Sequence, residues 1–252
     1  MTILQPSFFY LCGLLFDIYE YLYNIKIMEK KLRNTLIFIN ALFFVLAIAT
    51  DILYIKLGTP YTFKTLASLV FVVCGFTNVI ILVKTKHLAH KKYFIFMLIG
   101  LIFAMAGDIL LIDYFEIGAG LFAVGHVFYF ISYLTLQKFK PIDLAFILPT
   151  LAIALVVILT TGLNFDGMLP LILAYAVVIC TMLGKSASLF LSDKKNATMI
   201  FIGSLMFFLS DMFLMFCMFS SMGKIADLLC LAFYYPAQFI LASTPALIGR
   251  KK

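Results

Sequence analysis

The sequence is divided into apolar stretches of about twenty residues, which are separated by short connections that hold most of the charge. A helix of about 20 residues crosses the roughly 30 Å of hydrocarbon in a bilayer. Hydrophobic residues make up 64% of the chain and charged residues 12%, whereas a soluble domain has about 25% charged residues. The pattern therefore predicts an all-α integral membrane protein.

Eight apolar stretches are long enough to form transmembrane helices. They cover roughly residues 35–56, 65–83, 93–112, 117–136, 142–162, 168–190, 197–219 and 225–247. We expect a domain of eight transmembrane helices over residues 35–247, preceded by an N-terminal segment, 1–34, and followed by a basic cytoplasmic tail, 248–252.

The N-terminal segment contains a further apolar stretch, at residues 7–25, that carries one polar stripe. Its polar residues recur every three or four positions, which places them on one helix face: Tyr10, Gly13, Asp17, Glu20 and Asn24. This spacing favours an amphipathic helix lying in the cytoplasmic interface over a ninth span. No basic region precedes the stretch, which makes a signal peptide a poor interpretation.

Lysine and arginine residues lie almost entirely on one side of the expected membrane. Only Lys56, Lys64 and Lys224 lie on the other side, and Lys185 is counted here with the loop after the sixth span. The positive-inside rule then predicts that both termini are cytoplasmic. The membrane would be the inner membrane of a bacterium or the endoplasmic reticulum of a eukaryote. Topology thus explains the net charge of +7, and we expect no nucleic-acid partner.

The five cysteines are scattered within or beside apolar segments, at Cys12, Cys74, Cys180, Cys217 and Cys230. None has the spacing of a zinc site or of a disulfide framework. We interpret them as small packing residues and predict no metal site.

Ionisable residues inside a span cost about 3 kcal/mol even on a lenient scale, so each is a candidate for function. The candidates here are Lys64, Asp108, His126 and Asp211. Uncharged polar residues accompany them in the spans: Tyr129, Tyr175, Ser210, Tyr234, Tyr235 and Gln238. In the expected topology all four ionisable residues lie in the outer half of the membrane. This shared depth predicts one polar pocket opening to the lumenal or periplasmic side. The alternative is structural, with acids paired to Lys64 or to neighbouring helices and a packing histidine.

Two of the spans are similar to each other. IGLIFAMAGDILLI at 99–112 aligns without gaps with IGSLMFFLSDMFLM at 202–215, and the alignment superimposes Asp108 on Asp211. This predicts two parallel four-helix repeats with the site at their interface. Chance similarity between apolar helices is the alternative.

Two acids beside a lysine suit acid–base chemistry, because apolar surroundings favour a neutral carboxyl whereas a nearby cation keeps a second one ionised. One acid donates a proton while the other activates water, as in glycoside hydrolysis. A proton-coupled transporter uses such residues as a relay. Residue types and spacing leave both interpretations open.

Four motifs occur in a characteristic order along the chain. They are Gly107 with Asp108; His126 and Tyr129 in His-x-x-Tyr; Phe207, Ser210 and Asp211 in Phe-x-x-Ser-Asp; and Tyr234, Ala237 and Gln238 in Tyr-x-x-Ala-Gln. This order resembles the YhhN-like lysoplasmalogenase family over roughly residues 35–247, and Lys64 and Tyr175 look like two further family positions. Many members have Ala-x-Asn-x-Phe where this chain has Met215, Cys217 and Phe219, and the first 30 residues have no clear counterpart.

The resemblance implies hydrolysis of the vinyl-ether bond of a lysoplasmalogen, which gives a fatty aldehyde and glycerophosphocholine or glycerophosphoethanolamine. It implies Asp108 and Asp211 as the general acid and base, in an order that is left open, with Lys64 near the substrate phosphate. The remaining polar residues would bind substrate or water: His126, Tyr129, Tyr175, Ser210, Tyr234, Tyr235 and Gln238. No cofactor is implied, and the expected partners are the lysophospholipid and membrane lipids. A proton-coupled transporter, a lipid-binding protein or a hydrolase of another lysolipid are the alternatives.

Overall fold

The computed structural model describes residues 30–57, 60–85 and 90–248, and the regular structure in these ranges is helical. The helices are α2 (Lys30–Leu57), α3 (Pro60–Lys84), α4 (Lys91–Leu110), α5 (Phe115–Leu136), α6 (Pro141–Thr160), α7 (Leu169–Ser192), α8 (Lys194–Phe219) and α9 (Gly223–Ile248). The all-α prediction is confirmed for these residues, and each helix overlaps one predicted span. The amphipathic helix predicted at 7–25 lies outside the described residues.

Seven of the described helices, α3 to α9, are long and apolar enough to cross a membrane. The apolar part of α2, Asn34–Thr50, is shorter than these seven helices. The chain is therefore a multi-pass membrane protein by the length and composition of its helices, and the eighth span remains a prediction.

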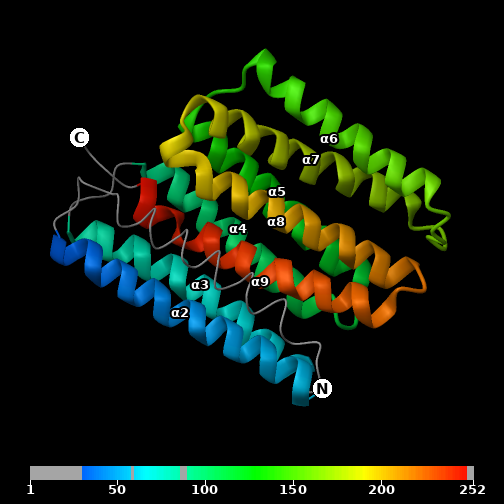
Figure 1. Cartoon of the computed structure of the whole chain (residues 1–252), viewed down its shortest axis with the longest axis horizontal. Coiled ribbons are helices and arrows are strands. Elements are labelled where there is room, and N and C mark those ends of the chain that lie inside the picture. Colours follow the sequence, from blue (N-terminus) through cyan, green and yellow to red (C-terminus); the bar gives the residue numbers. More distant parts are fainter. Residues whose placement is uncertain (1–29, 58–59, 86–89, 249–252) are drawn as a thin grey trace.

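The helices are arranged in layers across the bundle (Figure 1). Helix α2 lies outermost on one side, followed by α3, by α4 and α9, by α5 and α8, by α7, and finally by α6 on the other side. The most extensive packing joins α8 to α9 and α4 to α5. The four central helices therefore form the core, and α2 and α6 are peripheral.

The main packing contacts are alike on both sides of this core, although, among the described helices, α2 packs against α9 and α6 has no comparable contact with α5. Helix α3 packs against α9, and α7 packs against α5. In the predicted duplication these are equivalent contacts, since each joins the second helix of one repeat to the fourth helix of the other. Such an arrangement is what a pseudo-two-fold axis between the repeats would produce, although the duplication itself stays a prediction.

The two ends of the bundle carry different charges. The connections from α3 to α4, α5 to α6 and α7 to α8 share one end (Figure 1), which we call the basic end; its exposed residues include Lys91, Lys92, Lys138, Lys140, Lys194 and Lys195. The opposite end carries Asp113, Glu116, Asp166, Lys224 and Asp227. The positive-inside rule would place the basic end in the cytoplasm.

Assigning Lys185 to a loop was wrong. Helix α7 continues to Ser192, so Lys185 lies within this helix, and its side chain is completely buried in the bundle. Its Nζ donates a hydrogen bond to Oδ2 of Asp143 at 2.8 Å, and Ser188 Oγ donates to Oδ1 of Asp143 at 2.5 Å. A buried lysine is tolerated because the carboxylate at the start of α6 compensates its charge.

Next to this ion pair, α6 and α7 approach each other at Gly184. A Cβ added to Gly184 would lie 2.6 Å from Cα and N of Ile147, which are backbone atoms that cannot rotate away. We expect Gly184→Ala to lower stability by about 1–3 kcal/mol through overpacking. A thermal melt followed with a thiol-reactive fluorophore measures this change, because Cys74, Cys180 and Cys230 are buried in the fold.

The matched control is Gly120→Ala. No atom lies within 4 Å of a Cβ added at Gly120, so this helical substitution should leave the melting temperature unchanged or slightly higher. Equal melting temperatures for the two variants would show that the helices can separate at Gly184 without cost.

Candidate functional site

Asp108, near the end of α4, is buried among three donors from two other helices. The Nζ atom of Lys64 lies 3.3 Å from Oδ1 of Asp108. The Tyr235 hydroxyl donates to Oδ2 at 3.0 Å, and Ser68 Oγ donates to the same oxygen. Lys64 and Ser68 come from α3 and Tyr235 comes from α9. The negative charge of Asp108 is therefore compensated within the bundle, as the structural interpretation of this acid expects.

Asp211, in the second half of α8, forms a second cluster with side chains from α5 and α7. The Tyr175 hydroxyl donates to Oδ2 of Asp211 at 2.5 Å. The Nε2 atom of His126 lies 3.1 Å from the same oxygen and 2.9 Å from the Tyr175 hydroxyl. The Asp211 side chain remains 9% exposed. Among the described residues, the hydrogen-bond partners of this carboxyl are thus a phenol and an imidazole, and neither is a lysine.

The hydrogen-bond pattern indicates which nitrogen of His126 carries a proton. Tyr175 gives its proton to Asp211, so both neighbours of Nε2 are acceptors and Nε2 must donate. The ring is held in place by an edge contact with Phe207, whose centroid lies 4.5 Å away. The other nitrogen, Nδ1, is buried and has no hydrogen-bond partner among the described residues. His126 therefore contacts Asp211 without itself lining the apolar pocket beside that carboxyl.

Aromatic side chains lie between the two clusters. The Tyr234 ring contacts Tyr235 on one side at 4.9 Å and Phe207 on the other at 5.5 Å. Its hydroxyl donates to the carbonyl oxygen of Ala104 at 3.3 Å. The structure thus resolves the expected single polar pocket into two neighbouring hydrogen-bonded clusters. Each holds one acid through the helices that the predicted duplication makes equivalent, α3 and α9 for Asp108 and α7 and α5 for Asp211.

The remaining candidates from the sequence form hydrogen bonds with groups other than the two carboxyl groups. The Tyr129 hydroxyl donates to Oε1 of Gln238 at 2.7 Å, and both side chains are completely buried. Ser210 Oγ contacts Cys230 Sγ at 3.4 Å. These contacts join α5 and α8 to α9. Any role for them in binding substrate remains a prediction.

Sequence reasoning missed two polar residues that form buried hydrogen bonds in the structure, Ser68 and Asp143. Ser68, one helical turn after Lys64, donates to Asp108. The i, i+4 spacing of Lys64 and Ser68 is the signal that could have found it. Asp143 escaped notice because it lies in the first turn of α6, where an acid usually caps a helix; it accepts a hydrogen bond from the Lys140 backbone there.

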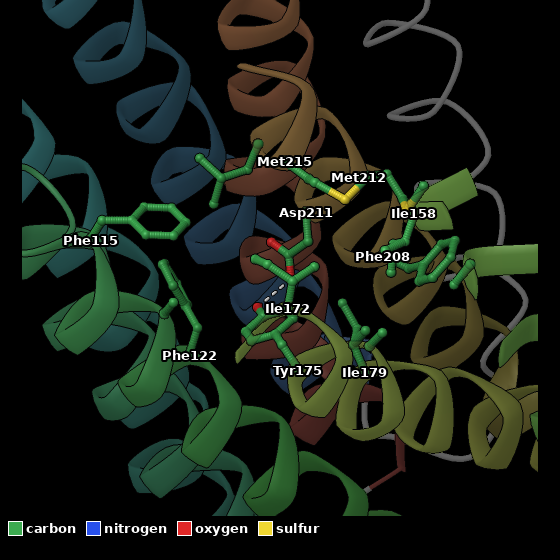
Figure 2. A pocket seen from close by; sticks show the side chains of 14 residues that line it. Phe115, Phe122, Ile158, Ile172, Tyr175, Ile179, Phe208, Asp211, Met212 and Met215 are labelled. Atoms are coloured by element: carbon green, nitrogen blue, oxygen red, sulfur yellow. Dashed lines mark hydrogen bonds between the residues drawn. The ribbon is translucent and has the colours of Figure 1, made fainter. Parts of the chain in front are cut away.

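An apolar pocket lies beside Asp211, between α5, α6, α7 and α8 (Figure 2). Its cavity volume is about 60 Å³ and its mouth is open, and Asp211 and Tyr175 are its polar lining residues. The other lining residues are apolar, among them Phe115, Phe122, Ile158, Ile172, Met212 and Met215. Lys64, Asp108, His126 and Gln238 do not line it. One of the two acids, Asp211, therefore faces an apolar cavity, whereas Asp108 does not line it.

Metal ligands do not cluster in the part of the chain that the structure describes. No group of three or more His, Cys, Asp or Glu side chains is placed there to hold an ion.

These features define a class: a multi-pass α-helical membrane protein with two buried carboxylate clusters, one of which opens to an apolar pocket. The model of the YhhN family matches residues 59–244, and the chain belongs to that family. No curated protein and no solved structure matches the chain. The matched range includes every candidate residue from Lys64 to Gln238.

Proposed function

We propose that this protein hydrolyses the vinyl-ether bond of a lysoplasmalogen and releases a fatty aldehyde and a glycerophospho-alcohol. Membership of the YhhN family suggests this type of activity. The observation that carries the proposal is the apolar pocket whose polar lining is a carboxyl and a phenol, Asp211 and Tyr175. Such a pocket suits a substrate that is hydrocarbon except for one reactive oxygen.

The reaction needs one proton donor and one water molecule. A proton added to the β-carbon of the vinyl ether turns the C=C–O unit into an oxocarbenium ion. Water then adds to the carbon that bears the oxygen and loses a proton, which forms a hemiacetal. The hemiacetal collapses when its C–O bond to glycerol breaks. The hydroxyl proton of the hemiacetal passes to the glycerol oxygen, which leaves as a hydroxyl, and the fatty chain leaves as an aldehyde.

Asp211 is the group we assign to these proton transfers. In its neutral form it donates the proton to the β-carbon, and as the resulting carboxylate it stabilises the cation and takes the proton from the attacking water. Its Oδ2 atom already accepts from Tyr175 and contacts His126. Both contacts hold the carboxyl in one orientation and disperse its charge during the cycle.

Asp108 has a different role in this proposal. It has a lysine partner and two hydroxyl donors, and it does not line the pocket. We assign it to positioning: it fixes Tyr235, which packs against Tyr234 between the two clusters. A substrate phosphate near Lys64 would have to share that ammonium group with Asp108.

Aldehyde release from purified protein tests the proposal. The substrates should be matched lysophospholipids with the same chain: the vinyl ether, the saturated alkyl ether and the ester. We expect aldehyde from the vinyl ether alone, because the saturated ether has no carbon that can be protonated to an oxocarbenium ion. Release of fatty acid from the ester would instead indicate a hydrolase of another lysolipid. Uptake driven by a pH gradient in proteoliposomes, without turnover, would indicate a carrier.

A further inference from the structure

The pocket beside Asp211 lies between two helices that hardly pack together. Phe115 and Ala119 of α5 and Ala154 and Ile158 of α6 line it. Among the described helices, α6 packs extensively against α7 alone. The side of the pocket between α5 and α6 is therefore closed by few contacts between helices, and it faces outward because α6 is peripheral (Figure 1).

The first half of helix α6 is held against α7 by an ion pair and by a close glycine contact. Near the basic end, the Asp143 ion pair with Lys185 and the close approach of Ile147 to Gly184 hold it against α7. Pro149 follows in the middle of the helix and removes one backbone hydrogen bond, which permits a bend. The half beyond Pro149 is the half that lines the pocket.

The buried residues in the second half of α6 are divided between two hydrophobic clusters: Ala154 belongs to the main core, whereas Ile158 belongs to a smaller cluster. Ile158 packs with Phe165, Ala176 and Met215, apart from the main hydrophobic core of the bundle. A helix segment with few buried neighbours opens at lower free energy than one in a central core. We therefore expect the part of α6 around Ile158 to open at a lower free energy than the part around Ala154.

The pocket also has a defined position along the bundle. Phe115 begins α5, whereas Ile158 and Met215 lie close to the ends of α6 and α8. All three are near the end of the bundle opposite the basic end. A headgroup has no polar lining inside the pocket beyond Asp211 and Tyr175, so it would have to stay at the surface of that end.

We infer that this pocket is a lateral binding site for a single hydrocarbon chain, which enters from the bilayer between α5 and the second half of α6 and places its first oxygen at Asp211 and Tyr175. The chain comes from a lysolipid in the leaflet at the end opposite the basic loops, which is the extracytoplasmic leaflet in the predicted topology. That the chain belongs to a lysolipid and that this oxygen belongs to a vinyl ether rest on the proposed function, but the apolar site and its route do not.

A photoreactive lysolipid tests the site without requiring turnover. The probe is a lysophosphocholine whose saturated, ester-linked chain carries a diazirine, added to the protein in phosphatidylcholine vesicles. Mass spectrometry of the labelled protein should find adducts on the start of α5 and on α6 beyond Pro149. Labelling confined to other surfaces would overturn the inference.

Two substitutions on α6 provide a matched pair. Ala154 is 1% exposed and lines the pocket, whereas Ala152, on the same helix, is exposed. Ala154→Phe should abolish labelling in the pocket, and Ala152→Phe should retain it. Ala154→Leu, a smaller change, should reduce labelling in a protein whose melting temperature shows that it is folded. Undiminished pocket labelling in folded Ala154→Leu and Ala154→Phe would contradict the assignment.

The outcome separates this inference from the proposed function. Labelling in the pocket of a protein that never releases aldehyde would support the chain site and overturn the hydrolase. Aldehyde release by a protein labelled only elsewhere would support the hydrolase and overturn the chain site.

Discussion

Asp211→Asn is expected to lower aldehyde release from lysoplasmalogen by a factor of about 10² to 10⁴, the usual contribution of a general acid–base group. The asparagine has nearly the same shape as the aspartate and can still accept the hydrogen bonds that Tyr175 and His126 offer. It cannot give a proton to carbon or take one from water. The loss should therefore appear in kcat, while binding of the saturated photoreactive lysolipid in the pocket persists.

The control for this variant is Asp166→Asn, which makes the same change on an exposed loop and should leave turnover unchanged. Asp108→Asn is a useful comparison, because it removes the carboxylate whose Oδ1 lies 3.3 Å from Nζ of buried Lys64 and should lower the melting temperature as well as activity. Wild-type turnover by Asp211→Asn would rule out the proposed proton donor. Equal losses of stability in both site variants would indicate that Asp211 is structural too.

Lys185→Met is expected to lower the free energy of unfolding by about 3 kcal/mol or more, because it leaves the Asp143 carboxylate buried without its cation. Both side chains are completely buried, so water cannot replace the lost partner. Lys185 Nζ also donates to the Lys138 carbonyl oxygen at 3.1 Å, a second bond that the variant loses. Denaturant unfolding or the thiol-reactive melt in detergent measures the effect.

Lys194→Met is the matched control, since Lys194 is exposed at the start of α8 and the same substitution there should change stability little. The double variant Asp143→Asn with Lys185→Met should recover much of the loss. Its asparagine carries no charge, and its side-chain oxygen can still accept from the Lys140 backbone. If the double variant unfolds at the same or a lower temperature or denaturant concentration than Lys185→Met, the buried charge is not the cause of the instability.

The Lys185 variant also tests whether the attachment of α6 to α7 affects the proposed binding site for the hydrocarbon chain. The ion pair holds the first half of α6 on α7, and the second half of the same helix walls the pocket. Loosening the attachment should therefore change pocket labelling even though Asp143, the partner of Lys185, lies at the opposite end of α6 from Ile158.

The positions of the helices could be read from the sequence because they depend on local properties. A backbone in hydrocarbon must form its hydrogen bonds within one helix, so a run of about 20 apolar residues is sufficient to predict a span. The same reasoning found Lys64, Asp108, His126 and Asp211, since an ionisable group among apolar residues is costly wherever it points. Lys185 was misplaced because its charge alone suggested a loop, whereas its partner is 42 residues away in the sequence.

The sequence by itself determined that this is a multi-pass helical protein, which family motifs it carries and roughly how deep each polar residue lies. Only the tertiary structure decided which of these residues touch one another. It paired Asp108 with Lys64, Ser68 and Tyr235, and it turned Asp211 toward a pocket that α5 and α6 close only loosely. The physical reason is that depth follows from position along one helix, whereas facing depends on how each helix is rotated against neighbours that are distant in the chain.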